Sequence, residues 1–276
     1  MKHPLLVSTR TAAALAIAAI MFFPVYWMLI TALKSPEELR LAVPTFWPER
    51  FMWSNFLNVF ETIPFARFSL NTIIQTAGIV VLQINIALMA AFAFAKGTFA
   101  GRDKLFLLVL AALIVPDQVV FVPIYVLLSK IGWIDTYFAL IIPHAASAYG
   151  IFLLRQTFRS MNNDVIEAAK MDGANRLRIL YSILTPMALP TVATMLVISF
   201  IGSWNSYFWP LVMTNSDKMR VLTVGLAKMR DSIAGNEALS FHLLMAASVT
   251  VILPIVVVFI FAQRHIITAM SNSTFK

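Results

Sequence analysis

The sequence predicts an all-α fold, a polytopic bundle of six transmembrane helices with both chain ends on the cytoplasmic side. Of the 276 residues, 60% are hydrophobic and 12% are charged, whereas soluble domains average about 45–50% apolar and about 25% charged residues. The net charge of +8 would suit a nucleic-acid partner, but the basic residues gather beside long apolar segments. We therefore expect a membrane surface as the partner of these charges, and no nucleic acid.

The six spans are predicted from segments without charged residues. A helix needs about 20 mostly apolar residues to cross the bilayer. Six segments meet this requirement, although Asp117 interrupts the third. They are bounded by residues 10 and 34, 67 and 96, 104 and 130, 135 and 155, 178 and 217 (its later part), and 237 and 264. We expect the whole chain, residues 1–276, to form one transmembrane domain.

The orientation follows from the basic residues in the connections. Together with the two termini, the connections on one side carry 12 Lys and Arg residues, against 9 on the other side. The same two sides carry 4 and 8 acidic residues. Because cytoplasmic loops are enriched in Lys and Arg, the first side is predicted to be cytoplasmic. The long loop of residues 158–186 lies on that side.

Two connections are predicted to be external. The loop of residues 34–67 has four prolines, which disfavour long helices, and its Trp47 and Trp53 suit a membrane–water interface. We expect it to form an ordered cap on the outer surface. The loop of residues 215–237 is predicted to contain a short helix over residues 221–233.

The loop of residues 158–186 has the pattern of two helices joined by a sharp turn. Asp164 and Glu167 have the spacing of an acidic capping box and predict a helix start near Asp164. Gly173 predicts the break, because glycine adopts a left-handed backbone without steric cost. Helical spacing of apolar residues resumes from Asn175, and Pro186 ends or kinks the second helix.

This loop resembles the EAA loop of the membrane subunits of binding-protein-dependent ABC importers. The matching residues are Glu167, Ala168, Ala169, Asp172, Gly173, Ala174, Ile183 and Pro186. Thr185 departs from the pattern, which usually has leucine before the final proline. The rest of the chain is similar to the sugar and glycerol-phosphate branch of that family, which includes maltose-permease-G-like proteins. The resemblance implies a MetI-like permease fold and a multi-pass location in the bacterial plasma (inner) membrane.

The resemblance also implies the partners and the source of energy. A second permease subunit would complete the pathway, two ATPase subunits would bind the EAA-like loops, and an extracytoplasmic binding protein would deliver a carbohydrate or related polyol. The loop of residues 215–237 would lie against that binding protein, although a plain linker is as good an interpretation of its sequence. The chain has no glycine-rich nucleotide loop, and no metal-ligand spacing or catalytic site is evident. We therefore expect no enzyme and no cofactor in this chain, with ATP and Mg bound by the partner subunits.

Four residues are candidates for the substrate pathway: Asp117, Gln118, Asn205 and Tyr207. Asp117 is the charged residue deep inside a predicted span, so its carboxylate should face protein or water. It could line or gate a pore, or form a hydrogen bond between helices. Asn205 and Tyr207 belong to an aromatic segment, residues 203–210, that is similar to a W-N-x-Y-F-W-P segment of sugar permeases. An aromatic interfacial belt is the alternative, and it is the preferred interpretation for Trp209.

The second predicted span carries a polar stripe of Asn71, Gln75, Gln83 and Asn85. Such stripes bind neighbouring helices as often as they line pores. Two other functions compete with an ABC importer subunit. A gradient-driven secondary transporter should show repeats or buried ionisable relays, and a membrane scaffold or sensor component would transport nothing.

Overall fold

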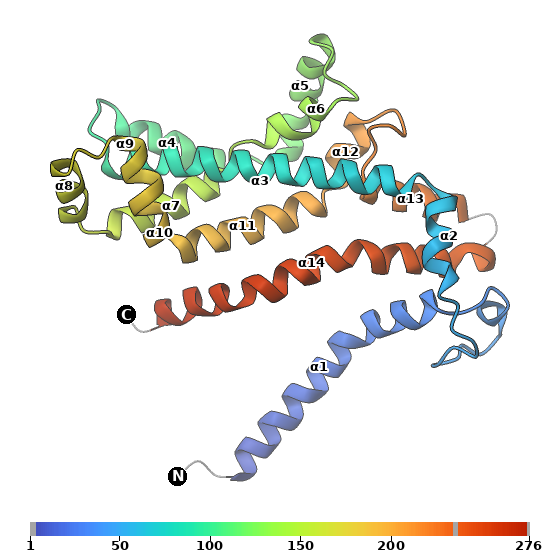
Figure 1. Cartoon of the computed structure of the whole chain (residues 1–276). Helices are drawn as coiled ribbons and strands as arrows, with labels where there is room; N and C mark the ends of the chain where they lie inside the picture. Colours follow the sequence, from blue (N-terminus) through green and yellow to red (C-terminus); the bar gives the residue numbers. More distant parts are fainter. Residues whose placement is uncertain (1–3, 234–236, 275–276) are drawn as a thin grey trace. The chain divides into compact units, whose positions relative to one another are not determined.

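The computed structural model describes the backbone of residues 4–233 and 237–274 (Figure 1). Side chains are not described for residues 4–10, 117, 232–240, 262 and 264–274. Helices and loops make up the described residues, and no strand occurs among them. The chain divides into two compact units: unit 1 comprises residues 1–67 and 222–254, and unit 2 comprises residues 68–221 and 255–276. Whether the two units form a single transmembrane domain stays a prediction.

Unit 1 is built from long apolar helices and the loop of residues 34–67. Its elements are α1 (Pro4–Ala32), the 3-10 helix η1 (Glu38–Arg40), α2 (Ser54–Thr62), α13 (Leu222–Ile233) and the first part of α14 (Glu237–Thr274). α13 confirms the short helix that was predicted over residues 221–233. Its bounds differ from the prediction only at the first residue.

Unit 2 contains the remaining helices and most of the described core. They are α3 (Phe65–Lys96), α4 (Arg102–Ala112), α5 (Asp117–Lys130), α6 (Tyr137–Ile141), η2 (Ile142–His144), α7 (Ala148–Ser160), α8 (Asp164–Met171), α9 (Arg176–Arg178), the π-helix η3 (Ile179–Leu184), α10 (Thr185–Met187), α11 (Leu189–Trp204) and α12 (Phe208–Met213). The first three residues of α3 fall in unit 1.

Candidate spans can be compared with the six that the sequence predicts. Among the described residues, three helical segments are long and apolar enough to cross a membrane: Thr11–Ala32, Phe65–Lys96 and Phe241–Phe261. Two bent pairs of helices meet the same test, so length and composition give up to five spans. The third predicted span is not one helix, because the chain leaves helical geometry between α4 and α5. Pro116 lies at this break with an extended backbone, as expected for a residue that donates no amide hydrogen bond.

The loop of residues 34–67 is ordered by buried polar groups. The Asn55 amide donates to the carbonyl oxygens of Ala32 and Lys34, at 2.9 Å each, and so satisfies acceptors at the C-terminal end of α1. The buried Glu38 carboxylate accepts hydrogen bonds from the Thr45 hydroxyl and the Glu49 amide. Trp47 and Trp53 stay largely exposed, which leaves both indoles available to a membrane interface. The position of this loop outside the membrane remains a prediction.

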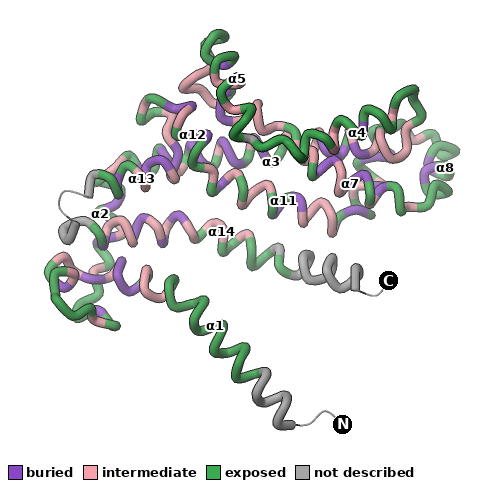
Figure 2. The backbone as a smooth tube through the Cα atoms, turned by 180° about the vertical axis from the view of Figure 1, so that it is seen from behind, coloured by how far each residue is buried: buried purple, intermediate pink, exposed green. Residues whose placement is uncertain are grey.

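The core of unit 2 joins six helical elements. Buried side chains from α3, α4, α7, α8, the π-helix and α11 form one hydrophobic cluster, whose members include Leu88, Phe106, Leu154, Phe158 and Leu180. Figure 2 shows this burial along α3, α7 and α11. Apolar packing therefore fixes the two helices of the loop of residues 158–186 to α3, α4 and α7.

Arg155 of α7 is buried at the edge of this cluster. Its guanidinium carbon lies 3.7 Å from the centre of the Phe106 ring, and its Nε donates to the Phe94 carbonyl at 3.3 Å. Its Nη2 forms an ion pair with Asp103 at 3.5 Å. Phe94 belongs to the last turn of α3, whose carbonyl groups have no partner within the helix. One cation therefore ties α7 to the end of α3 and to the start of α4.

Asp135 closes the turn between α5 and α6 onto the segment after α12. Its φ of 64° lies in the left-handed region, where aspartate is one of the better-tolerated side chains. The carboxylate accepts hydrogen bonds from the Asn215 amide at 2.9 Å, the Ser216 amide at 3.1 Å and the Ser216 hydroxyl at 2.6 Å. Burial alone would raise the pKa of the Asp135 carboxyl. The hydrogen bonds from Ser216 and Asn215 outweigh it, so that pKa lies below its ordinary value.

We predict a pH-dependent closure at this turn. A carboxylate with a lowered pKa stabilises the folded state above the ordinary carboxyl pKa, and this stabilisation is lost as pH falls through the lowered value. The Asn215 and Ser216 amides should thus stay protected from hydrogen exchange between neutral pH and about pH 5. They should lose protection in more acid solution. In Asp135→Ala the protection should fall about thirtyfold at neutral pH, for a loss of about 2 kcal/mol, and should no longer depend on pH.

Hydrogen exchange of the peptide that contains residues 214–217, corrected for the intrinsic pH dependence, measures this closure. Asp135→Asn is the matched variant, because asparagine tolerates the left-handed backbone and keeps one acceptor oxygen. It should lie between the native chain and the alanine variant. Equal protection in all three chains would show that the Asp135 carboxylate does not hold the turn.

Candidate functional site

The segment predicted to form a two-helix hairpin does so, and we name residues 158–186 the coupling hairpin. α8 begins at Asp164, and Gly173 breaks the helix with a φ of 76°. The Gly173 amide donates to Lys170, and the Ala174 amide donates to Ala169 at 2.9 Å, which together form a Schellman motif. An ideal Cβ built on Gly173 would meet no atom within 4 Å. Backbone conformation, not crowding, therefore requires glycine here.

The start of α8 corrects one detail of the sequence prediction. Asn163 is the N-cap residue, and no side chain caps the helix. The Asp164 carboxylate instead accepts a hydrogen bond from the Asn162 amide group at 2.8 Å, outside the helix. The predicted capping box between Asp164 and Glu167 therefore does not form, because the first carboxylate is occupied by its own neighbour.

The second helix of the hairpin begins as predicted and then widens. The Asn175 side chain accepts from the Arg178 amide at 2.8 Å, which is N-cap geometry. Residues Ile179–Leu184 form a π-helix, a rare conformation that is frequent at functional sites. The Thr185 hydroxyl donates to the Leu180 carbonyl at 2.8 Å. Thr185, the residue that departs from the family pattern, thus supplies a second donor to a carbonyl of the π-helix.

The hairpin ends in a sharp change of direction. The helical segment Arg176–Met187 and the segment Leu189–Trp204 are bent by 86° relative to each other. Pro186 lies in the first two residues of α10, where its missing amide donor costs little. The predicted kink is therefore present, and it is completed at Ala188 rather than at the proline.

The motif residues lie on two different faces of the hairpin, and Figure 2 shows both buried and exposed backbone in α8. Ala169 is buried against the core of unit 2, whereas Ala174 and Ile183 are half-buried beside it. The outer face exposes Glu167, Ala168, Asp172, Gly173 and Pro186. Met171 is 89% exposed and Leu177 is 60% exposed, so two apolar side chains stand at the tip without cover. Sequence reasoning missed these two, because apolar residues in a helical pattern are expected on the buried face.

Two polar contacts attach the coupling hairpin to α3. The Tyr181 hydroxyl donates to the Asn85 side-chain oxygen at 3.0 Å. The Lys96 ammonium donates to the Met161 carbonyl at 2.7 Å and to the Asn163 side-chain oxygen at 2.6 Å. Neither contact was predicted, because the partners are 96 and about 65 residues apart in the sequence.

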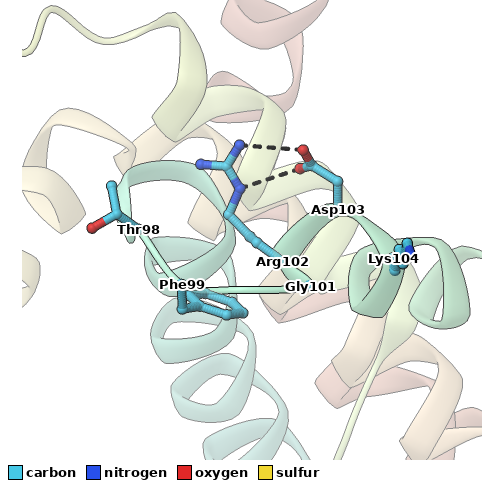
Figure 3. Close-up of a pocket in the computed structure, with 6 residues that line it drawn as sticks. All are labelled: Thr98, Phe99, Gly101, Arg102, Asp103 and Lys104. Atoms are coloured by element: carbon cyan, nitrogen blue, oxygen red, sulfur yellow. Dashed lines mark hydrogen bonds and ion pairs between the residues drawn. The ribbon is translucent and has the colours of Figure 1, made fainter.

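The loop between α3 and α4, which follows Lys96 in the sequence, forms an open hollow. It has a volume of about 370 Å³ and is lined by Thr98, Phe99, Gly101, Arg102, Asp103 and Lys104. Figure 3 shows the Arg102 guanidinium facing the Asp103 carboxylate, with Nε 3.2 Å from one carboxylate oxygen. Hydrogen bonding from Arg102 and its charge hold the pKa of Asp103 below its ordinary value. The hollow belongs to a short, charged loop that is open to solvent, and Phe99 is the one aromatic side chain in its lining, whereas small-molecule sites are enclosed and lined mostly by apolar side chains.

The predicted pathway residues are not brought together by a described cavity. Asn205 is the C-cap of α11, and its amide donates to the Ile201 carbonyl at 3.0 Å. Asn205, Tyr207 and Gln118 are exposed. Asp117 begins α5, but its side chain lies outside the described residues. Asn205 and Tyr207 lie at the break between α11 and α12, and Gln118 lies just after the break between α4 and α5.

Trp209 does not belong to an exposed aromatic belt. It is only 9% exposed, and its indole Nε1 donates to the Ala139 carbonyl at 2.9 Å. Phe121 and His144 pack edge-on against its ring. The belt interpretation of Trp209 is therefore wrong, because its indole hydrogen bond is satisfied inside unit 2.

The polar stripe of α3 serves mainly to bind neighbouring elements. The Asn71 amide donates to the carbonyls of Lys218 and Arg220, and its oxygen accepts from the Tyr137 hydroxyl. Gln83 donates to the His144 carbonyl at 2.8 Å. Gln75 is buried, and neither of its side-chain polar atoms has a hydrogen-bond partner among the residues that the structure describes. Three of the four polar residues thus join α3 to other segments of unit 2.

Known proteins resemble the chain over almost its whole length. It is 31% identical to the arabinooligosaccharides transport system permease protein AraQ of Halalkalibacterium halodurans, over 92% of this chain and 91% of that protein. It is 30% identical to the diacetylchitobiose uptake system permease protein NgcG of Streptomyces coelicolor, over 94% and 85%. It is 28% identical to the sn-glycerol-3-phosphate transport system permease protein UgpE of Pectobacterium atrosepticum, over 91% of each.

A solved structure has the same fold. A chain from the crystal structure of a bacterial ABC transporter involved in the import of the acidic polysaccharide alginate matches with a TM-score of 0.85 and 24% identity. The match covers 96% of this chain and 98% of that one. The family model for the inner membrane component of binding-protein-dependent transport systems matches residues 9–272. The chain therefore belongs to the family of inner membrane components of binding-protein-dependent transport systems.

Proposed function

We propose that the chain forms half of the translocation pathway of an ATP-driven importer and binds an ATPase subunit through the coupling hairpin. The observation that carries this proposal is the two-faced hairpin: Ala169 packs into the core of unit 2, while Glu167 and the tip residues Met171 and Leu177 face outward. An exposed apolar tip flanked by charges is suited to a groove on another protein. ATP and Mg would be bound by the ATPase subunits, and this chain would hold no cofactor of its own.

The proposed assembly contains five proteins in a bilayer. This chain would pair with a second permease subunit, two ATPase subunits would bind at the cytoplasmic side, and an extracytoplasmic binding protein would deliver the solute. The crystal structure of a bacterial alginate ABC transporter in complex with an alginate pentasaccharide-bound periplasmic protein, which matches this chain with a TM-score of 0.56, supports a binding protein as a partner. Nucleic acid has no part in this function.

The topology we propose has six spans with both termini in the cytoplasm. In the described part of the chain, three uninterrupted helices are long enough to cross a membrane. A total of six therefore requires that α4 with α5, the bent pair α6–α7, and α11 each make a single crossing. The distribution of Lys and Arg supports this arrangement, because the side that carries the termini and the coupling hairpin has 12 of them and the other side has 9. Cytoplasmic loops are enriched in these residues.

Cysteine labelling tests the topology directly, because the chain has no native cysteine. We expect Ser160→Cys, at the start of the coupling hairpin and away from its apolar tip, to react with a membrane-impermeant maleimide only after spheroplasts are opened. Trp53→Cys, on the loop of residues 34–67, should react before opening; both side chains are exposed in this chain. Labelling of Ser160→Cys in intact spheroplasts would overturn the proposed orientation.

A carbohydrate or a related polyol is the proposed solute class. The relatives are named for transport of arabinooligosaccharides, diacetylchitobiose and glycerol 3-phosphate, and all three solutes carry hydroxyl groups. Asn205, Tyr207 and Gln118 are the proposed pathway residues in this chain. They lie at helix breaks, where backbone polar groups leave the regular helical hydrogen-bond pattern and can meet a polar solute. The role proposed for Asp117 is the same, through its place at the start of α5.

Reconstitution separates the three candidate functions. The complex is purified through an affinity tag on this chain, placed in liposomes with its binding protein, and supplied with each of the three solutes named above as a radiolabelled probe. We expect uptake of at least one probe that requires ATP. Uptake driven by an ion gradient without ATP would favour a secondary transporter, and absence of uptake of every probe with a competent binding protein would favour a scaffold or sensor component.

Gly173 provides the sharpest test of the coupling hairpin. Gly173→Asp should leave the chain in the membrane but reduce ATP-driven import by at least about tenfold, because a side chain at a φ of 76° opposes the Schellman turn. Gly173→Asn is the matched control, since asparagine adopts the left-handed backbone more readily. It should retain more import than the aspartate variant. Normal import by Gly173→Asp, with ATPase subunits still bound, would contradict a role of the hairpin in coupling.

A further inference from the structure

Lys96 occupies the joint between α7 and the coupling hairpin. It is the last residue of α3, and Met161 and Asn163, which accept its two hydrogen bonds, are the C-cap of α7 and the N-cap of α8. One ammonium group therefore holds both ends of the linker through which α7 enters the hairpin. Both bonds are short, at 2.7 and 2.6 Å, as expected when the donor is charged.

The position of Lys96 also suits its charge. The Met161 carbonyl lies where α7 ends, and the ammonium itself stands at the C-terminus of α3. Helix C-termini carry partial negative charge and favour a cation. Lysine has three donors on a flexible stem, so one side chain can reach a backbone carbonyl and a side-chain oxygen together.

A second contact holds the other helix of the hairpin to the same element. Tyr181, in the π-helix, donates to Asn85 of α3. Asn85 and Lys96 are 11 residues apart, which is about 16 Å along a helix. Between these two points α3 contributes Ala87, Leu88 and Ala91 to the hydrophobic cluster that also contains Ile166 and Leu180 of the hairpin. Both helices of the hairpin are therefore fixed to one uninterrupted stretch of α3.

We propose that Lys96 is a positioning residue that makes α3 move with the coupling hairpin, so that α3 carries nucleotide-driven movement into the membrane part of the chain. The inference deepens the proposed function and depends on it. It assigns the transmission of movement to the contact of Lys96 with Met161 and Asn163, and not to the peptide chain that leads from the hairpin into α11. Removing the Lys96 ammonium should then separate movement of the hairpin from movement of α3 while the ATPase stays bound.

A distance measurement tests the proposal without knowledge of the solute. Spin labels are placed on Ala93→Cys, exposed on α3, and Val165→Cys, exposed on α8 away from the apolar tip, in the assembled complex. With Lys96 present, the interspin distance should stay unchanged when ATP and vanadate are added. In Lys96→Met the distance distribution should broaden about twofold and should shift with nucleotide. Lys104→Met, an exposed lysine in the next helix, should behave as the native chain.

The same variants give a functional readout. Import per ATP hydrolysed should fall about two- to thirtyfold in Lys96→Met. Lys96→Arg, which restores a charged donor, should recover most of the loss, and Lys104→Met should show none. Recovery by arginine separates positioning from general damage to the fold.

Three results would overturn the proposal: a nucleotide-dependent distance in the native chain, an unchanged distance distribution in Lys96→Met, or a native ratio of import to ATP hydrolysis in that variant. The native complex in the same assay reports on the proposed function separately. If it imports solute with ATP and Lys96→Met does so equally well, the inference about Lys96 fails alone. If the native complex shows no ATP-dependent import, the proposed function itself fails.

Discussion

The packing of the coupling hairpin against α3, α4 and α7 is the interaction on which the rest of unit 2 depends. Ile166, Ile179, Leu180 and Leu184 are almost completely buried in it. Burial of such a side chain stabilises the fold by about 2 kcal/mol. Ala169 permits this packing, since a larger side chain on the buried face of α8 would force the helix away from its neighbours.

Apolar burial and the polar contacts have different roles in this arrangement. A hydrogen bond that involves a charged group contributes about 1.5–3 kcal/mol, which is small beside the summed burial of the hairpin's apolar side chains. The hairpin should therefore stay folded when the Lys96 ammonium is removed. Hydrogen bonds are directional, however, and a hydrophobic surface is not. The polar contacts can accordingly fix where the hairpin sits on α3 even though they do not hold it together.

The turn of the hairpin could be predicted from sequence because its determinants are local. Gly173 and Asn175 act on backbone groups within three residues, and the structure places both as expected. The capping box failed for an equally local reason, since Asn162 offers the Asp164 carboxylate a nearer donor. The capping rule considers only the hydrogen bonds between the cap residue and the first turn of the helix. It fails where a neighbouring side chain forms a competing hydrogen bond with the cap residue.

Contacts between distant segments could not be predicted from this sequence. The sequence shows the polar residues of α3 as a stripe, but their spacing does not distinguish residues that line a pore from residues that bind a neighbouring helix. Asn71 and Gln83 proved to bind backbone carbonyls of other segments, and Trp209 found an acceptor at Ala139. These partners are carbonyl groups in the loop after α12 and in the short helices α6 and η2, where the last four carbonyls of a helix have no partner within it. Hydropathy and periodicity carry no information about such groups, because they depend on where the chain departs from regular structure.

The geometry of the hairpin also bears on how movement could leave it. Between Arg176–Met187 and Leu189–Trp204 the helix axis turns by 86°, so a displacement of the hairpin along its own axis would reach α11 nearly at right angles. The π-helix and the turn at Ala188 interrupt the regular ladder on this route. α3, by comparison, is a single helix of 32 residues with no proline inside it. A displacement transmitted sideways through Lys96 and Asn85 therefore acts on an unbroken helix, whereas the covalent route passes through the π-helix and the turn at Ala188.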